Sequence, residues 1–331
     1  MKNNFEFLAG NEKKVADKSV TQENKDNRIV ELFLAKENIQ LLEEFSSITL
    51  DELKAKFAPG SKIVACDFAI KGVEKVGNLK PWGFEAEEVT SIDHHAPVEE
   101  MSKMVSSTTL AIEMKKSGKK IDADAIIAVN HTDCDSVLTM AILSDILPPE
   151  EKFNEAAIAA DHTGKKNEIA DLLQALQVKR DLQFSLKNLQ ALLNEEPLDE
   201  EAEKLLEKRF ADRKKAQAAV SEGHFTKSRK VFYISLAEKI DGAFFPALVS
   251  EAGAIVVCSP MPDGSGKFSM KTRLGMQAPI GFVLNKAGLP DFGGRWNAGD
   301  TKRNGGTALS VEKFASLLEE AIEKYKQESE K

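Results

Sequence analysis

The sequence predicts an α/β protein in which a mostly parallel sheet forms an N-terminal domain, a helical connector follows, and a smaller α/β domain ends the chain. Short apolar segments alternate with helix-like ones, and a leucine-rich stretch separates two groups of them. With 42% hydrophobic residues, the 331-residue chain can bury the cores of two domains. The expected divisions are a tail or edge segment 1–27, a first domain 28–167, the connector 168–225 and a second domain 226–331.

The first domain is expected to start with helix and then alternate. From 28 to 57 apolar residues recur at helical spacing, and Leu50 to Phe57 forms a second amphipathic segment. The later strands and helices follow in order: KIVACD (62–67), EEVTSID (87–93), a helix from Thr108 to Lys116, AIIAVN (125–130), a helix from Ser136 to Ile146, and NEAAIAAD (154–161). This alternation favours an open parallel sheet, in which sites lie at the carboxyl ends of strands.

Residues 168–222 have leucines at three- and four-residue spacing and a single proline, which predicts helices. After Gly223 the pattern changes to strand-like segments and a closing helix: KVFYISL (230–236), AIVVCSP (254–260), KFSMKTRL (267–274) and Val311 to Tyr325. Asp263-Gly264-Ser265-Gly266 supplies a turn between two of these strands.

Charge and composition exclude several classes of protein. The formal net charge of −8 argues against binding to long nucleic acid, which needs a basic surface. The chain has no apolar run of 18 residues and no signal-peptide pattern, so we expect a cytoplasmic protein with no membrane partner. Its three cysteines indicate neither a disulfide framework nor a zinc-thiolate site. A homodimer is left open.

Aspartate and histidine gather in a few places. Four of the five histidines lie beside aspartates, in SIDHHAP (91–97), HTDCDS (131–136) and ADHTG (160–164). A thiolate-free set of carboxylates and imidazoles favours Mn²⁺, with Mg²⁺ or Co²⁺ as alternatives, and the number of candidate ligands favours two ions. His162 is a weaker candidate because it can simply pack or cap, and His224 is expected to be exposed.

Geometry supports a shared site. If HTDCDS leaves its strand still extended, then His131, Asp133 and Asp135 point to one side, and Asp67 and Asp161 add carboxylates from other strand ends. Taken alone, each aspartate can equally be a helix N-cap. Four such positions together favour a metal site.

A basic, glycine-rich segment near the C-terminus suggests anion binding. From 267 to 303 there are seven Lys or Arg against two Asp, although the whole chain is acidic. The candidate substrate-binding residues are Arg273, Gly293, Gly294, Arg295, Lys302, Arg303, Gly305 and Gly306. A glycine-rich surface turn is the alternative, and Trp296 fits either base stacking or a core. GSGK at 264–267 is not an ATPase phosphate loop, because Met261 replaces its first glycine.

These residues resemble the DHH phosphoesterase superfamily, which includes RecJ-like nucleases and oligoribonuclease/pAp-phosphatase enzymes. Asp93-His94-His95 is similar to the motif that names the family. Four further segments resemble its other motifs: VACD (64–67), SSTTLAIEM (106–114) as the Ser/Thr-rich helix start after Asp-His-His, AAIAAD (156–161), and HTDCDS, which is similar to the H-x-D-x-D segment. The C-terminal part resembles the DHH-associated domain, with a variant glycine-rich loop that lacks the usual histidine.

The order of the motifs departs from the family, which places the H-x-D-x-D segment first. Either the sheet is rewired so that AIIAVN takes the first-strand position, or the first motif is lost and the site is incomplete. We favour rewiring, because Asp161 already fits the later motif.

The resemblance also implies roles. His131, Asp133 and Asp67 would hold one ion, and Asp135, Asp67, His94 and Asp161 the other, with Asp93 behind the histidines. Asp67 would bridge the ions, a hydroxide between them would attack phosphorus, and His95 would face the substrate as phosphate ligand or proton donor.

Two functions of different classes follow. The first is a metal-dependent phosphohydrolase acting on a small phosphorylated substrate: a short oligonucleotide, another nucleotide-like molecule or an inorganic phosphate chain. The alternative is a non-catalytic nucleotide- or metal-binding regulatory protein derived from the same fold.

Overall fold

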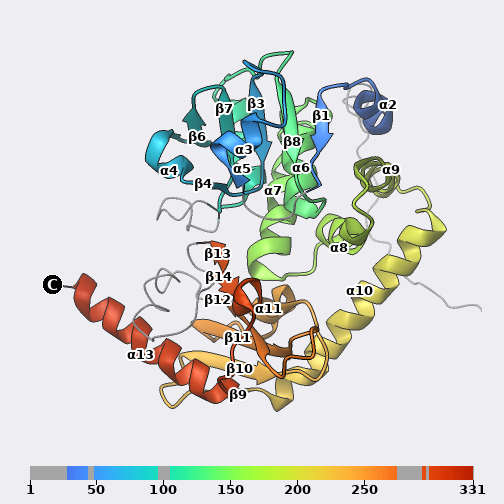
Figure 1. Cartoon of the computed structure of the whole chain (residues 1–331). Helices are drawn as coiled ribbons and strands as arrows, with labels where there is room; N and C mark the ends of the chain where they lie inside the picture. Colours follow the sequence, from blue (N-terminus) through green and yellow to red (C-terminus); the bar gives the residue numbers. More distant parts are fainter. Residues whose placement is uncertain (1–27, 44–47, 96–104, 274–292, 296–297, 331) are drawn as a thin grey trace, which may run out of the picture.

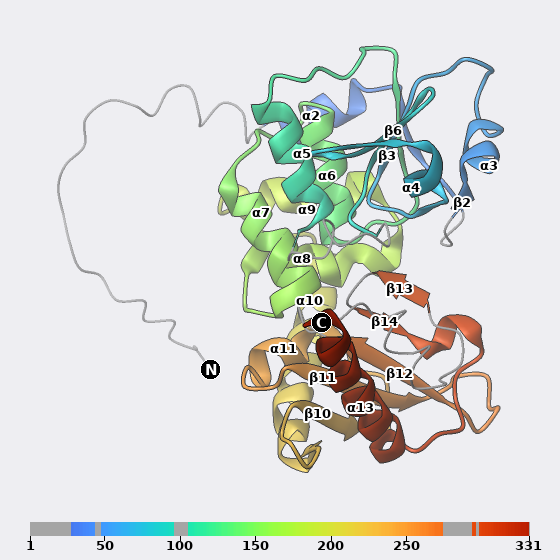
Figure 2. The ribbon, with the colours of Figure 1, turned by 90° about the vertical axis from the view of Figure 1, so that its left-hand side faces the viewer.

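The computed structural model describes residues 28–43, 48–95, 105–273, 293–295 and 298–330. The expected tail 1–27 lies outside these residues. The chain forms two units that each contain a six-stranded sheet, one above the other in Figure 1 and, from the side, in Figure 2. Among the described residues, no helix is both long and apolar enough to cross a membrane.

The first sheet has the strand order β1-β8-β3-β7-β6-β5. Its strands are β1 Ile39–Leu41, β8 Ile126–Val129, β3 Ile63–Cys66, β7 Val89–Ile92, β6 Gly83–Ala86 and β5 Asn78–Lys80. The four strands from β1 to β7 pair in parallel, and β6 and β5 add antiparallel strands at one edge. The mostly parallel sheet expected from the sequence is therefore present.

The helix expected over 28–57 is partly wrong. The segment contains α2 Ile29–Leu34, then β1, then β2 Ile48–Thr49 and α3 Leu50–Lys54. Leu42 N–H donates to Val129 O at 2.7 Å, so the chain pairs with β8 instead of coiling. A segment as short as Ile39–Leu41, with Gln40 between two apolar residues, fits the spacing of a helix and of a strand. Pairing with β8 decides its conformation. β2 pairs with β4 Ile70–Lys71, and α4 Val73–Val76 follows.

Helices cover both sides of the first sheet (Figure 2), and the larger group lies on one side. This group consists of α5 Ser107–Lys116, α6 Cys134–Leu143, α7 Glu151–Ile158, the π-turn η2 Ala159–Thr163, α8 Glu168–Leu176, η3 Gln177–Lys179 and α9 Leu182–Leu193. Every residue of α6 is buried. A helix that is apolar on nearly all sides belongs in the core.

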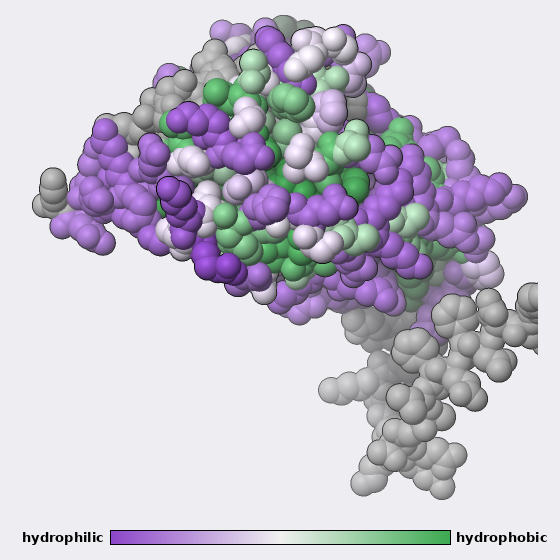
Figure 3. Space-filling view, turned by 90° about the horizontal axis from the view of Figure 1, so that it is seen from below, coloured by the Kyte–Doolittle hydropathy of each residue, from purple (hydrophilic) through white to green (hydrophobic). Residues whose placement is uncertain are grey.

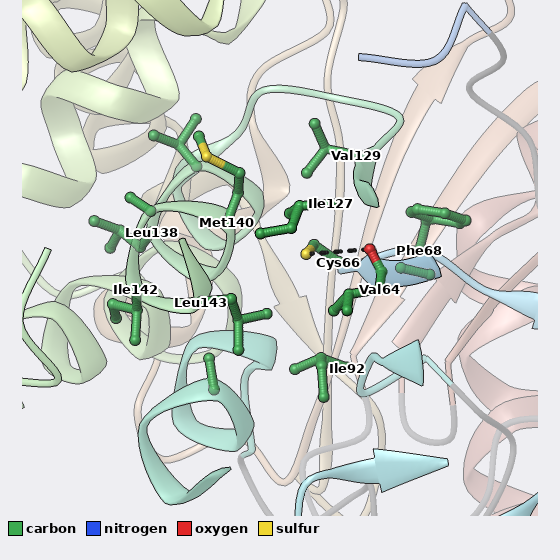
Figure 4. Close-up of a cluster of buried hydrophobic side chains, with 14 of the residues drawn as sticks. Val64, Cys66, Phe68, Ile92, Ile127, Val129, Leu138, Met140, Ile142 and Leu143 are labelled. Carbon is green, nitrogen blue, oxygen red and sulfur yellow. Dashed lines mark hydrogen bonds between the residues drawn. The ribbon is translucent and has the colours of Figure 1, made fainter. Parts of the chain in front are cut away.

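The core of the first unit forms where α6 meets the sheet. Side chains of β3, β7 and β8 contact side chains from α6 in Figure 4, and all of those drawn with labels are buried. The thiol of Cys66 donates to Val64 O at 3.8 Å within this cluster. This packing fixes the start of α6 against the carboxyl ends of the strands.

The helices predicted over 168–222 are present. α8 and α9 pack on the core of the first unit. The long helix α10 Glu200–Ala219 then runs along the side of the molecule to the second unit (Figure 1), and η4 Val220–Glu222 ends it. Only Ala202, Arg209 and Ala216 of α10 are buried. Its mostly exposed surface is typical of a helix that bridges two units.

The second sheet has the order β13-β14-β12-β11-β10-β9. Its strands are β13 Gly293–Arg295, β14 Ala298–Asp300, β12 Phe268–Arg273, β11 Ala254–Pro260, β10 Val231–Ser235 and β9 His224–Phe225. Among its described strands, only β10 and β11 pair in parallel. The described part of this unit also contains η5 Gly242–Phe244, α11 Phe245–Leu248, η6 Thr301–Asn304 and α13 Val311–Ser329.

Helix α13 packs on the second sheet through Phe314 and Leu318, and Phe244 and Phe245 belong to a second cluster of the same unit. The face seen from below in Figure 3 is mostly hydrophilic, with smaller hydrophobic areas between the polar side chains.

Candidate metal centre

Three adjacent strands of the first sheet end at the same level. Cys66 at the end of β3 lies opposite Val129 of β8 and Ile92 of β7. The next residues are therefore polar groups at one edge: Asp67, Asn130 and Asp93. Asp67 has a left-handed backbone (φ 59°), which aspartate tolerates better than most residues, and its side chain is 1% exposed. The sheet thus delivers Asp67 to the centre of the site.

The HTDCDS segment lies beside Asp67. Nε2 of His131 is 3.3 Å from Oδ2 of Asp67 and 3.4 Å from Oδ2 of Asp133. Asp133 also accepts the N–H of Ser136 at 3.0 Å as the N-cap of α6. The capping and ligand interpretations are therefore compatible for this residue, since a carboxylate has two oxygens.

Asp135 reaches the site from the first turn of a helix and not from the extended segment that the sequence predicts. Helix α6 starts at Cys134, so the segment is not extended up to Asp135, and the predicted alternation ends early. The carboxylate instead accepts the N–H groups of Ser107 at 2.8 Å and Thr108 at 2.7 Å, at the start of α5. Asp135 is 0% exposed and joins the first turns of two helices.

His94 is the point where the motifs meet. Its Nε2 lies 3.6 Å from Asp67 Oδ1, 3.7 Å from Asp135 Oδ2 and 3.3 Å from Asp161 Oδ2. Its Nδ1 is hydrogen-bonded to Val105 O, so Nε2 is directed at the three carboxylates. The structure therefore brings the displaced HTDCDS segment and the Asp-His-His segment to one place.

Asp93 and His95 form a pair at the side of this centre. Asp93 Oδ1 and His95 Nδ1 are 2.6 Å apart, and His95 Nδ1 is 3.8 Å from Asp67 Oδ1. The His95 side chain is 25% exposed, whereas Asp93 is 2% exposed. Asp93 belongs to none of the potential ligand sets found among the described residues, and its contact is with His95.

The expected strand end at Asp161 is wrong. Asp161 lies in the π-turn η2 that continues α7, and Gly164 N–H closes this turn on Ala159 O at 2.9 Å. The small residues of AAIAAD fit a buried helix as well as a strand, and packing among helices decides between them. The carboxylate still reaches the site, because its Oδ2 is close to His94.

Three sets of side chains in the described residues place possible ligand atoms within 4.8 Å of one another: Asp67 with His94 and His95, His94 with Asp161 and His162, and Asp67 with His131 and Asp133. Carboxylate oxygen and imidazole nitrogen are the donors that divalent ions such as Mn²⁺ take. The residues present therefore fit divalent metal ions.

Burial gives this cluster unusual acid–base properties. Burial, followed by the neighbouring Asp135 carboxylate, raises the pKa of Asp67 to about 8. Burial also raises the pKa of Asp135. For Asp133, burial opposes ionisation, but the nearby His131 imidazole outweighs it and lowers the pKa. Without cations, several buried carboxylates face one another, an arrangement that bound positive ions relieve.

The second unit reaches the site through β12. The guanidinium of Arg273 donates to Asp161 O. Through the strand register, Arg273 pairs with Ala298 of β14, and Ala298 pairs with Arg295 of β13. Gly293 and Gly294 precede Arg295 on β13. The side chains of Arg295 and Arg303, and all of Trp296, lie outside the described residues.

The other candidate substrate-binding residues, Lys302, Gly305 and Gly306, follow β14 in the chain. Lys302 is exposed on η6, and its N–H donates to Asp300 Oδ1 at 2.7 Å. Gly305 and Gly306 have left-handed backbones and precede Thr307, which bridges to Phe268. Phe268 starts β12 and Arg273 ends it, a span of roughly 16 Å. The structure therefore does not place this glycine pair next to Arg273.

Several polar residues of the site were not singled out from the sequence. The hydroxyl groups of Ser107 and Ser136 each donate to Asp67 at 2.8 Å. Nδ1 of His131 is 2.6 Å from Asn130 Oδ1, and Arg180 donates to Asn130 O at 3.2 Å. The Ser/Thr-rich helix start at 106–114 was a visible signal for Ser107, whereas nothing in the sequence near 180 points to this strand end.

The chain has a distant likeness to several solved structures. No family model and no curated protein matches the chain. A pGpG-specific phosphodiesterase of Vibrio cholerae, PggH, is 13% identical with a TM-score of 0.37, over 65% of this chain and 88% of that one. RecJ of Thermus thermophilus in complex with Mg²⁺ is 14% identical with a TM-score of 0.33, over 67% of this chain and 34% of that one.

An exopolyphosphatase-related protein of Bacteroides fragilis is 15% identical with a TM-score of 0.38, over 94% of this chain and 77% of that one. All three are DHH superfamily members, the family that the motifs resemble.

Proposed function

We propose that this chain is a divalent-metal-dependent phosphohydrolase that cleaves a phosphoester or phosphoanhydride in a small phosphorylated substrate. The observation that carries the proposal is the position of Asp67. Its Oδ1 is 3.6 Å from His94 Nε2, and its Oδ2 is 3.3 Å from His131 Nε2. The two oxygens of one buried carboxylate thus face two different groups of side chains, one around His94 and one around His131. In this position Asp67 would contribute to both ion sites.

The residues divide between two positions. His131 and Asp133 would hold one ion on the Oδ2 side of Asp67, and His94, Asp135 and Asp161 would hold the other on the Oδ1 side. Two bound divalent ions supply Lewis acidity and lower the pKa of water, which suits phosphoryl transfer. Mixed nitrogen and oxygen donors favour Mn²⁺, with Mg²⁺ and Co²⁺ as alternatives.

The protein groups around the ions position the substrate and handle protons. Asp93 holds the Nδ1 side of His95, which leaves Nε2 directed away from that carboxylate. Burial opposes ionisation of Asp93, but the His95 imidazole outweighs it, and the pKa of Asp93 is lowered. With its Nδ1 held by Asp93, His95 would face the substrate through Nε2, as phosphate ligand or proton donor. Arg273 would neutralise charge on the non-reacting part of the substrate.

We assign residues 28–167 to a metal-binding domain, 168–225 to a connector and 226–331 to a substrate-binding domain. Arg273, at the end of β12, lies beside the Asp161 turn. This contact supports a substrate held between the two domains.

A metal and substrate panel tests the proposal. The full chain is stripped with chelator, titrated with Mn²⁺, and assayed on pAp, dinucleotides, pyrophosphate and polyphosphate. The expected result is about two Mn²⁺ per chain and hydrolysis of at least one substrate. Asp67→Ala should weaken Mn²⁺ binding and slow hydrolysis strongly, whereas Asp122→Ala should change neither, because Asp122 is an exposed aspartate paired with Lys62 at 2.6 Å.

Two outcomes contradict the proposal. If the parent chain binds no Mn²⁺, or if Asp67→Ala hydrolyses a substrate as fast as the parent, the proposed site is wrong. If ions bind with full stoichiometry and no substrate of the panel turns over, the result favours a metal-binding regulatory protein.

A further inference from the structure

His162 follows Asp161 on the π-turn η2 and lies beside His94. The two imidazole rings are 5.7 Å apart between centroids. Possible ligand atoms of His94, Asp161 and His162 lie within 4.8 Å of one another. The two-ion arrangement proposed above uses the first two of these residues and leaves His162 without a role.

The shape of the π-turn accounts for two consecutive side chains at one place. Gly164 N–H closes on Ala159 O, five residues back, at 2.9 Å. Such single wide turns are rare in helices and are frequently found at functional sites. Here the turn places both Asp161 and His162 against His94.

One main-chain carbonyl contacts both rings. Val105 O is hydrogen-bonded to Nδ1 of His94 and lies 3.2 Å from Nε2 of His162. Histidines that bind metals commonly donate their second ring N–H to a carbonyl, which fixes the tautomer and the orientation of the ring. An imidazole that donates from Nε2 carries its lone pair on Nδ1. Val105 thus orients His162 in the manner expected of a ligand.

We propose that His162 is an additional ligand of the ion held by His94 and Asp161. The inference rests on the proposed metal centre and deepens it. The ion on this side would then have two imidazole nitrogens, whereas the ion beside His131 and Asp133 would have one. Imidazole favours transition metals over Mg²⁺, so the two positions should differ in selectivity.

Cobalt titration of the metal-free chain tests the proposal. Co²⁺ binding is followed by visible absorption and by calorimetry for the parent, His162→Gln and the matched control His224→Gln. His224 is exposed on β9 of the second unit. In His162→Gln, the Kd of one of the two Co²⁺ sites should rise about 10- to 100-fold, with a changed spectrum. The other site and the control should behave as the parent does, and Mg²⁺ affinity should change less than Co²⁺ affinity.

The outcomes separate this inference from the proposed function. A parent chain that binds no Co²⁺, Mn²⁺ or Mg²⁺ contradicts both. Two bound ions in the parent, with the same Co²⁺ affinities and spectrum in His162→Gln, contradict only the role of His162.

If circular dichroism shows that His162→Gln does not fold, a measurement on the parent chain replaces it. The parent chain with isotope-labelled histidine is titrated with Zn²⁺ and followed by NMR. A stoichiometric shift of the ring signals of His162 supports the inference, and unshifted His162 signals overturn it. The signals of His224 should stay unchanged in either case.

Discussion

The two flanks of Asp67 are built in different ways. The first flank, His131 and Asp133, follows β8 and caps α6, so strand pairing and a buried helix within one unit hold it. The second flank, Asp161 and His162, lies on a π-turn between two helices. The position of the first flank thus depends on elements within one unit, whereas that of the second flank depends on packing between units.

The contacts of the second flank show this dependence. Arg273 of β12 donates to Asp161 O, and Arg213 of α10 donates to Gly164 O at 2.8 Å. Gly164 is so close to η5 that an added Cβ would lie 2.0 Å from Ala243 O. The second flank is therefore held by contacts with the second unit and with α10.

Replacing the residue shared by both flanks should have the largest effect. Asp67→Ala removes the carboxylate that faces His94 and His131, so binding of both ions should weaken. Loss of several kcal/mol of transition-state stabilisation corresponds to at least about a thousandfold lower kcat/KM. Hydrolysis rates and Mn²⁺ stoichiometry measure the two effects together. Retention of one tightly bound ion would show that the flanks are independent.

Gly164→Ala should disturb only the second flank. The residue has φ +64°, and its Cβ would overlap Ala243 O, so we expect a loss of about 3 kcal/mol in the free energy of unfolding. Gly264→Ala is the matched control, because Gly264 has φ +70° with nothing within 4 Å of an added Cβ. The control should lose only about 1 kcal/mol, the cost of the left-handed backbone. Equal losses in urea denaturation would show that the contact with Ala243 is unimportant.

The ion pairs behind the second flank predict a pH dependence. Asp241 pairs with Lys271 at 3.2 Å and Arg209 at 3.3 Å. Burial opposes its ionisation, but these two cations outweigh burial and hold its pKa well below the usual value. The stabilisation is therefore present above about pH 4, the pKa in the unfolded chain, and is lost as the pH falls through the lower folded value.

Asp241→Asn should therefore lower the free energy of unfolding by about 2 kcal/mol at pH 7, and the difference from the parent should shrink below about pH 4. Urea denaturation at a series of pH values measures it. Asp263→Asn, in an exposed turn of the same unit, serves as the control. A difference that stays independent of pH throughout the acid range would contradict the ion-pair explanation.

Arg180→Ala should have the smallest effect and act on the first flank. Arg180 donates to Leu42 O at 2.7 Å and to Asn130 O, and Asn130 contacts His131. Loss of such outer contacts typically costs about tenfold in metal affinity. Arg229→Ala is the matched control for Arg180→Ala, because Arg229 also has a positive φ (59°) but lies in the second unit. Calorimetric titration with Mn²⁺ should show a change for Arg180→Ala alone.

The sequence predicts the first flank and the sheet better than the second flank. Continuous apolar runs such as 63–66 and 125–129 have few alternatives to buried strands, so the strand ends expected before Asp67 and His131 are present. At Ile39–Leu41 and at Asp161, short segments of small or apolar residues fit both helix and strand. Only contacts with distant parts of the chain decide those cases.

The same reason explains the residues that pattern reasoning leaves out. Arg180 acts on main-chain carbonyl groups 50 and 138 residues away, and such contacts have no signature in the local sequence. His162 is adjacent to Asp161, but consecutive residues reach one site only because the helix widens there. The glycine pair at 305–306 resembles a substrate loop by composition, yet the strand register puts it at the far end of β12 from Arg273.

Backbone N–H groups in the first turns of α5 and α6 donate to carboxylates of the centre. Ser107 and Thr108 donate to Asp135, and Ser136 donates to Asp133. The positive ends of two helix dipoles therefore share the negative charge before any cation binds. We therefore expect folding and metal loading to be separable: a chain emptied by a chelator should keep its scaffold and take up divalent ions in the folded state.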